Sequence, residues 1–299
     1  MGKGSDGARD DATTGRPPLT PDAQRLTPAD EDPRVHTREY YERLYSLEGT
    51  HWWFRGTRAI ATAILGARYR GGRELTVLDA GCGTGIVVSQ LRRLLPGARV
   101  LGLDVSRHAL KFCRARGHRL LAAASVTDLP LPDESVDLIV CADVLQHLSR
   151  GGDAVALREC RRVLRPGGRL YLRTNTTLGR ARTTGDEDYH RYQPDELAAC
   201  VAAAGLEVEQ LSYANALPSL FAAARRRLGR GPVAGDAGER DRGLHLRPLP
   251  SWQLPLNRAL ALLLWLEGRY LGRSGIRGVR RLPFGHSLIL LARKPASDG

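Results

Sequence analysis

The sequence is poor in several features that would mark a protein class. Lysine occurs only three times in 299 residues, so arginine carries nearly all of the excess of 45 basic over 32 acidic side chains. A net charge of +13 would suit nucleic acid or an anionic surface. Arginine- and alanine-rich sequences are also produced by GC-rich genomes, so both explanations stay open.

Cysteine is sparse as well and shows no pairing pattern. The five cysteines are odd in number and have no C-x-x-C spacing. This pattern favours neither a disulfide framework nor a zinc site, and we expect no bound metal. Unpaired thiols suit a reducing cytoplasm, which is the location we expect.

Long apolar runs are also missing. Residues 1–33 lack the apolar core of a signal peptide, and we expect 1–35 to form a disordered tail. The apolar segment 254–267 has an uncharged run of only eight residues, between Arg258 and Glu267. Because a bilayer-spanning helix needs about twenty, we expect no transmembrane segment. Contact of this segment with a membrane surface or a lipid-linked substrate remains an alternative.

The most informative stretch is TVLDAGCGTG, residues 76–85. Apolar residues lead into Asp79, and glycines follow at 81, 83 and 85 before the helix-like segment 86–91. The pattern predicts a buried strand, a tight turn and a helix start. Glycine permits positive φ and close approach of a ligand, and a helix N-terminus presents free N–H groups. We therefore expect a nucleotide-like cofactor here.

The spacing of the glycines disfavours a dinucleotide. The fingerprint G-x-G-x-x-G requires a small residue where this chain has Ile86. Asp104 ends the predicted strand 100–103, about twenty residues beyond the glycines, where an acid can accept the ribose hydroxyls of any adenosine. An NAD-linked oxidoreductase would also have an acid at the position of Asp104, but its glycine fingerprint would not have isoleucine at position 86.

Strand-like and helix-like segments alternate from residue 77 to 174, which predicts a parallel sheet wound by helices. We expect further strands at 120–124, 169–174, 206–213 and 284–292, and helices at 37–45, 58–65, 86–95, 107–116, 154–164, 218–228 and 254–267.

Several of these segments resemble class I S-adenosylmethionine (SAM) methyltransferases. Asp79-x-Gly81-x-Gly83-x-Gly85 is similar to motif I of that family, and 125–130, 144–148 and 164–168 are similar to its later motifs. HWWF at 51–54 and LPFGHS at 282–287 are similar to one bacterial subgroup, known mostly by sequence. The resemblance covers residues 40–295.

The resemblance implies an α/β fold with a Rossmann-like seven-stranded sheet, helices on both faces and an antiparallel last strand. It also implies a division of the chain. The expected parts are a tail at 1–35, a helical cap at 36–72, a SAM-binding core at 73–215, a helical insert or lid at 216–283 with a flexible loop at 229–250, and a final strand and tail at 284–299.

The family's cofactor contacts carry over to matching positions. The implied SAM-binding residues are Asp79, Gly81, Gly83 and Gly85 at the methionine end, with Cys82 in a slot common in the family, Asp104 at the ribose, and Asp128 and Leu129 at the adenine. We also expect Val105 and Cys141 to contact the cofactor, and the cluster of aromatic and arginine side chains suggests Trp53 and Arg58 as a cap of its pocket. An arginine there could bind the SAM carboxylate. Two alternatives stay open: the aromatic cluster could be a hydrophobic plug, and Asp128 could cap a turn.

Methyl transfer from SAM is an in-line SN2 step that needs alignment and removal of water. A base is required only where the nucleophile must lose a proton, and His147 and His190 are the candidates. Possible substrate contacts are Tyr41, His147, Tyr189, Arg191 and Tyr192. A structural role for His147 and a solvated loop at 189–192 are equally open.

We expect a SAM-dependent methyltransferase acting on a small molecule, such as a secondary metabolite or a saccharide-like intermediate. A nucleic-acid substrate is disfavoured because the D/N-P-P-Y/F motif is absent after the fourth strand, where 141–144 reads CADV. A lipid-linked acceptor and a non-catalytic SAM-binding partner protein are the remaining alternatives.

Overall fold

The computed structural model describes residues 37–69, 74–149, 151–176, 190–220, 254–273 and 281–296. The predicted tail at 1–35, the predicted loop at 229–250 and Tyr189 lie outside the described residues. The predicted helix at 218–228 is described only as far as residue 220.

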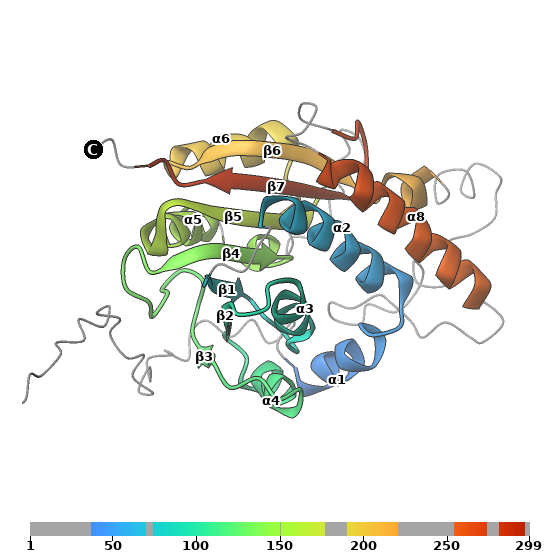
Figure 1. Ribbon diagram of the computed structural model, residues 1–299, viewed down its shortest axis with the longest axis horizontal. Helices are drawn as coiled ribbons and strands as arrows, with labels where there is room; N and C mark the ends of the chain where they lie inside the picture. The colour runs from blue at the N-terminus through green and yellow to red at the C-terminus, as the bar shows by residue number, and fades with distance from the viewer. Residues whose placement is uncertain are drawn as a thin grey trace, which may run out of the picture.

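A seven-stranded sheet forms the centre of the molecule (Figure 1), with the order β3-β2-β1-β4-β5-β7-β6. Neighbouring strands from β3 to β5 are parallel, and β7 is antiparallel to both β5 and β6. The strands are β1 (Thr76–Ala80), β2 (Arg99–Asp104), β3 (Leu121–Ala123), β4 (Val136–Ala142), β5 (Leu164–Asn175), β6 (Glu207–Ala214) and β7 (Ser287–Arg293). This confirms the predicted Rossmann-like α/β fold.

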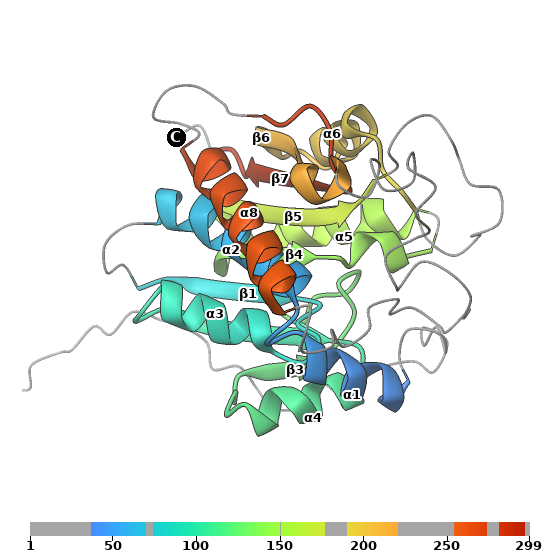
Figure 2. The ribbon, with the colours of Figure 1, turned by 90° about the vertical axis from the view of Figure 1, so that its right-hand side faces the viewer.

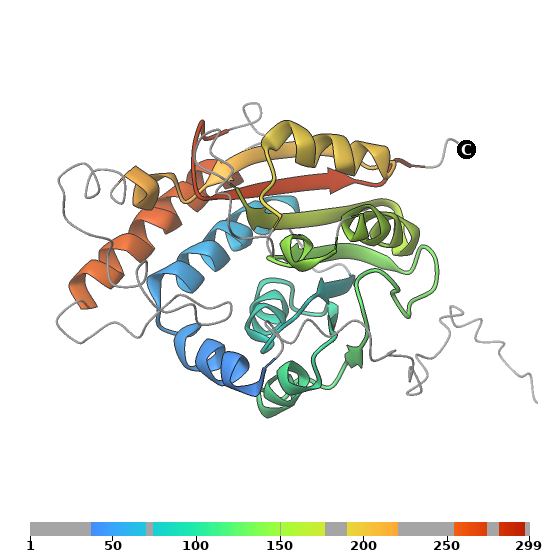
Figure 3. The same ribbon diagram turned by 180° about the vertical axis from the view of Figure 1, so that it is seen from behind.

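Helices cover both faces of the sheet, so the central strands are mostly apolar. On one face lie α2 (Trp52–Arg68), α3 (Ile86–Leu94) and α8 (Leu254–Gly272), and on the other α5 (Gly152–Val163) and α6 (Pro194–Ala203), as Figures 1 and 3 show. Two separate clusters of buried apolar side chains fill the two layers. The helices α1 (Arg38–Leu47) and α4 (Arg107–Ala115) lie side by side near β3.

Several elements differ in length from the sequence prediction, and α2 differs most, because it begins at Trp52 and not at the predicted residue 58. β3 is shorter, and β5 begins five residues earlier because Leu164 already pairs with Val136 before a register shift in β4. α8 extends past the predicted end at 267 to Gly272. Gly268 lies inside α8 although glycine disfavours a helix interior, and both it and Gly272, the last residue of the helix, face α2.

Glycines on both helices let α8 and α2 pack closely. A Cβ on Gly268 would lie 2.9 Å from the Cα of Ile60, and one on Gly56 would lie 2.2 Å from Cδ1 of Leu264. The two helices are therefore closer than larger residues would permit.

Among the described helices, none is both long and apolar enough to cross a bilayer.

Buried polar groups fix α8 at both ends. Asn257 accepts a hydrogen bond from the main-chain N–H of Trp52 at 2.7 Å and donates to the carbonyl of Thr50 at 3.0 Å. The buried carboxylate of Glu267 accepts the N–H groups of Asn215 at 2.5 Å and Ala216 at 3.1 Å, just beyond β6. α8 is thus joined to the start of α2 and to the end of β6.

The close α2–α8 contact gives a stability prediction. Gly56→Ala should lower the free energy of unfolding by about 1–3 kcal/mol, because the new methyl group overlaps the buried Leu264 and separates the helices. Gly66→Ala is the matched control in the same helix. Its Cβ would meet only Cδ1 of Leu94 at 3.4 Å, so it should leave stability unchanged or raise it by up to about 1 kcal/mol. Urea denaturation of both variants measures the difference, and equal effects would contradict this packing.

Candidate functional site

The loop after β1 turns sharply at the carboxyl edge of the sheet. Gly81, Gly83 and Gly85 have φ values of +82°, +52° and +83°, a region that favours glycine. The N–H of Gly81 donates to the carbonyl of Leu103 at 2.7 Å, which holds the loop against β2. A Cβ on Gly81 would lie 2.2 Å from Cγ2 of Val144, so the loop also packs against the segment after β4.

The buried carboxylate of Asp104 holds the middle of this loop. Its Oδ2 accepts the N–H of Gly83 at 2.8 Å, and its Oδ1 accepts the N–H of Ser106 at 2.8 Å. Each carboxylate oxygen can accept a second hydrogen bond. Asp104 can therefore bind hydroxyl groups of a ligand while it keeps the loop in place.

Two buried polar atoms at this edge have no hydrogen-bond partner among the described residues: Oδ2 of Asp79 and Nη1 of Arg58. Burial, together with the charge of Asp104, raises the pKa of Asp79 to about 8. Burial also lowers the pKa of Arg58 to about 10. Unpaired buried polar groups are costly, so an acid and a guanidinium left without partners indicate a place for a ligand of mixed charge.

Arg173, near the carboxyl end of β5, is a further charged residue of this region. Its Nε lies 3.0 Å from Oδ1 of Asp143, and its Nη2 pairs with Oδ2 of the same carboxylate. Asp143 follows β4 in a left-handed conformation, with φ of +59°. The positive charge of Arg173 partly offsets the rise in the pKa of Asp79. The same charge adds to the fall in the pKa of Arg58. The sequence analysis missed Arg173, although a charged side chain within the apolar run LYLRT was a usable signal.

A second ion pair links α1 to the glycine loop. Glu48 is buried and accepts hydrogen bonds at 2.5 Å from both the hydroxyl of Thr84 and Nη2 of Arg116. Arg116 also donates from Nε to the carbonyl of Thr84 at 2.9 Å, and its guanidinium lies 4.3 Å from the ring centroid of Tyr45. The sequence analysis assigned no role to these residues, because 68 positions separate Glu48 from Arg116.

Tyr41 and the aromatic motif at 51–54 lie in the helices that precede β1. Tyr41, predicted as a substrate contact, is buried beside Ser106 and Asp104, and burial raises the pKa of its hydroxyl. His51 begins α2 by accepting the N–H of Trp53 at Nδ1, at 3.2 Å. Burial lowers the pKa of His51 to about 4, so the ring is neutral and can accept this bond.

The two tryptophans of this motif differ in their surroundings. Trp52 packs against the apolar cluster on the α2 face of the sheet. Trp53 is half-buried and meets Trp52 edge to face, with 5.7 Å between ring centroids. The motif therefore supplies an anchor through Trp52 and leaves Trp53 partly open to a ligand.

At the predicted adenine end, Asp128 is exposed and its N–H donates to Ser125 at 3.2 Å. Leu129 is buried, and its N–H donates to Oε2 of Glu159 at 2.9 Å. Its main-chain donor is therefore already used, and its side chain belongs to the buried apolar cluster under α5. Val105, after β2, is half-buried.

The two predicted cofactor-site cysteines are buried. Cys82 lies inside the glycine loop with its Sγ 3.7 Å from that of Cys113, which itself lies 3.1 Å from the carbonyl of Gly83. Cys141 is buried in β4, and burial raises the pKa of its thiol. Within the described ranges, no cluster of three or more histidine, cysteine or acidic side chains could hold a metal ion.

The predicted catalytic histidines occupy different environments. His147 is half-buried at the end of a 3-10 turn, Leu145–His147, three residues after the valine that packs on Gly81. His190 is exposed, with Nε2 2.8 Å from Oε1 of Glu196.

Tyr192 and Arg191 also differ from each other. The ring of Tyr192 lies 4.2 Å from that of His190, but its hydroxyl is buried and donates to Asp153 at 3.0 Å. Tyr192 thus connects the segment before α6 to α5, whereas Arg191 is exposed.

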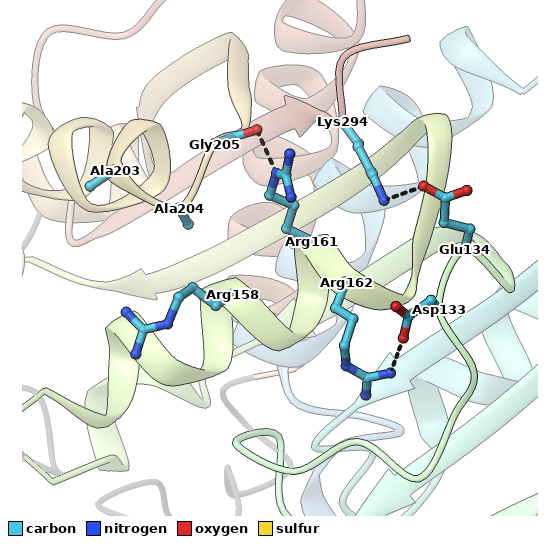
Figure 4. Close-up of a pocket in the computed structure, with 9 residues that line it drawn as sticks. All are labelled: Asp133, Glu134, Arg158, Arg161, Arg162, Ala203, Ala204, Gly205 and Lys294. Carbon is cyan, nitrogen blue, oxygen red and sulfur yellow. Dashed lines mark hydrogen bonds and ion pairs between the residues drawn. The ribbon is translucent and has the colours of Figure 1, made fainter. Parts of the chain in front are cut away.

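A cavity of about 680 Å³ lies elsewhere, at the amino ends of the parallel strands (Figure 4). Three of its four basic groups are engaged within the protein: Lys294 pairs with Glu134 at 3.0 Å, Arg162 with Asp133 at 2.8 Å, and Arg161 donates to Gly205 at 3.2 Å. None of the predicted cofactor or substrate residues lines it.

The loop with alternate glycines, the acid at the end of β2 and the strand order occur together in one class of cofactor-binding domain. Residues 78–172 match the family model of the methyltransferase domain. A Mycolicibacterium smegmatis protein named as a probable S-adenosylmethionine-dependent methyltransferase is 34% identical over 168 residues, which cover 54% of this chain and 62% of that protein.

Solved structures show the same fold. One is a chain of the complex between the Haloferax volcanii Trm112 methyltransferase activator and a protein assigned as a methyltransferase, with a TM-score of 0.57, 20% identity, and coverage of 89% of this chain and 99% of that chain. Another is the [4+2]-cyclase SpnF, with a TM-score of 0.51, 22% identity, and coverage of 80% and 82%.

The residues at this edge of the sheet and on α2 fit SAM. The amino-acid end of SAM carries an ammonium and a carboxylate, and Oδ2 of Asp79 and Nη1 of Arg58 are buried atoms without a hydrogen-bond partner among the described residues that suit the two groups. Gly83 has the most open surroundings of the loop glycines, because a Cβ there would meet only Cδ2 of Leu44 at 3.9 Å, so a ligand can approach the main chain at this position.

The ion pair between α1 and the loop gives a second prediction. Glu48→Ala should lower the free energy of unfolding by about 2–3 kcal/mol, because it leaves Arg116 without its buried partner. Glu42→Ala removes an exposed pair with Arg38 in the same helix and should change stability little. Thermal and urea denaturation measure both variants. Similar losses would show that the Glu48 pair contributes no more than a surface contact.

Proposed function

We propose that this protein is a SAM-dependent methyltransferase that methylates a small molecule. The observation that carries the proposal is the pair of unpartnered buried atoms, on Asp79 and Arg58, beside the glycine loop. The match of residues 78–172 to the methyltransferase domain supports it. The relative in Mycolicibacterium smegmatis is matched over 62% of its length, so the activity of the whole protein is part of this proposal.

In this proposal the protein holds the cofactor by complementary charge. Asp79 accepts hydrogen bonds from the ammonium, Arg58 donates to the carboxylate, and Asp104 accepts from the ribose hydroxyls. Bound SAM supplies a methyl group made electrophilic by the sulfonium. The side chains of Leu129 and Val105 contact the base, and Asp128 accepts from its amino group.

The protein's remaining tasks are to exclude water and to align the acceptor. We infer that the helices of 36–72 act as a cap, because Glu48 and Tyr41 join α1 to the glycine loop and to Asp104. We further infer that α8, the described helix of the predicted insert, is part of a lid, and that the motif HWWF is a feature of the bacterial subgroup noted above. The acceptor then enters beside His147, with His190 and Arg191 farther out on the segment before α6.

A SAM-binding protein without methyl transfer is the second candidate. The likeness to a cyclase favours keeping it, because it shows that this fold also occurs in a protein named for another reaction. Binding of SAM alone does not separate the two candidates. Transfer of a labelled methyl group from SAM to an acceptor does, in a screen of hydroxylated, amine and saccharide-like small molecules.

Cofactor binding should depend on Asp79. Asp79→Asn should weaken SAM binding roughly tenfold to a hundredfold in calorimetry, because it removes a charge-assisted hydrogen bond to the ammonium. Without cofactor, the carboxyl group is largely protonated at neutral pH, since its pKa is raised to about 8. The same substitution should therefore change the free energy of unfolding by less than about 1 kcal/mol.

Asp133→Asn is the matched control, because Asp133 is exposed at the opposite end of the sheet. It should bind SAM as the wild type does. Wild-type affinity in Asp79→Asn would contradict the placement of the ammonium, and no SAM binding by the wild type would remove the proposed function.

His147 is the proposed general base for a hydroxyl acceptor. With an acceptor found in the screen, His147→Ala should lower kcat/KM by about 10²–10⁴-fold near neutral pH and leave SAM affinity unchanged. His190→Ala is the comparison, because that ring is exposed and bonded to Glu196. Wild-type activity of His147→Ala across the pH range would exclude His147 as the base.

A further inference from the structure

The outer side of α8 combines exposed apolar and basic side chains. α8 carries six of the twelve large apolar side chains that are exposed among the described residues. Leu262, Trp265 and Leu266, which are 55%, 44% and 48% exposed, recur with Arg258, Arg269 and Arg273 three or four residues apart. We call these six residues the outer stripe.

The outer stripe lies on the surface layer of the molecule. Figure 2 shows α8 outside α2, and the C-terminal part of α8 also reaches β6, where Nε2 of Gln210 donates to the carbonyl of Leu271 at 3.3 Å. The opposite side of α8 is used for packing, because Leu260, Leu264 and Leu271 are buried there with the two glycines that face α2. The packing on α2 therefore holds the helix in place and leaves the outer stripe outside the core.

The exposed charged side chains of this helix are all basic. Its single acidic residue, Glu267, is buried and accepts main-chain N–H groups beyond β6. The charged groups of the outer stripe are arginines, and the guanidinium of Arg269 lies 5.0 Å from the ring centroid of Trp265. A second copy of the chain on this stripe would bring arginines against arginines, which disfavours self-association.

We propose that the outer stripe of α8 binds the surface of an anionic phospholipid membrane. Leucine and tryptophan side chains enter the boundary between headgroups and acyl chains, as in amphipathic interfacial helices. The arginines extend along the same side and meet lipid phosphates, since their long stems are apolar and their ends are charged. The net charge of +13 adds attraction toward the same surface. This inference does not depend on methyl transfer.

Sedimentation of the full chain with phospholipid vesicles tests this proposal. We expect binding to phosphatidylcholine vesicles that contain phosphatidylglycerol, weaker binding at raised salt, and little binding to phosphatidylcholine alone. Leu262→Glu should reduce the bound fraction about tenfold or more, because a charge replaces the most exposed apolar group of the stripe. Val155→Glu, an equivalent change on the exposed side of α5, should bind as the wild type does.

A second readout guards against loss of folding in Leu262→Glu. Vesicles should shift the tryptophan emission of the wild type to shorter wavelength, and Trp265→Phe should remove most of that shift while it keeps vesicle binding. Equal binding to both lipid compositions, wild-type binding by Leu262→Glu, or an emission shift retained in Trp265→Phe would overturn the proposal. So would light scattering that shows a dimer disrupted by Leu262→Glu, because a second copy would then cover the stripe.

Discussion

The conformation of the glycine loop depends on the buried carboxylate of Asp104. It accepts one main-chain N–H from the loop and one from the start of α4, so it joins two segments that follow neighbouring strands. The same negative charge, together with burial, raises the pKa of Asp79. The carboxyl edge of the sheet therefore holds one acid that binds two main-chain N–H groups and one whose Oδ2 has no hydrogen-bond partner among the described residues. This difference defines the site.

Buried polar side chains also decide how the outer helices attach to the sheet. Glu48 joins α1 to the loop, His51 begins α2, and Asn257 and Glu267 bind α8 at its two ends. Each satisfies main-chain or side-chain donors that would otherwise be buried without partners. Apolar contact alone would let a helix slide along the sheet, whereas these directional bonds give each helix one position.

The positive charge near Arg58 and the exposed positive charge on α8 both depend on which acidic side chains make contacts inside the protein. Glu267 is the only acidic residue of α8, and it is buried. The exposed charged side chains of the helix are therefore arginines. Arg173 is paired with Asp143, and its positive charge lowers the pKa of the nearby Arg58. The distribution of charge over the molecule is thus a consequence of which acids are used to hold elements together.

Local patterns were enough to predict the parts of this protein whose cause is local. Alternating strand and helix signals predicted the parallel part of the sheet, and the glycines at alternate positions predicted the loop, because backbone preferences act between near neighbours. The full set of seven strands, with an antiparallel last strand, was implied by the family resemblance. Asp104 was predicted from its place at a strand end. Contacts between distant positions could not be predicted in this way: Glu48 with Arg116, Arg173 with Asp143, and Gly268 with Ile60. Those depend on how the helices and strands pack, so only the tertiary structure decided the extent of α8, the partners of the buried charges and the side of α8 that faces outward.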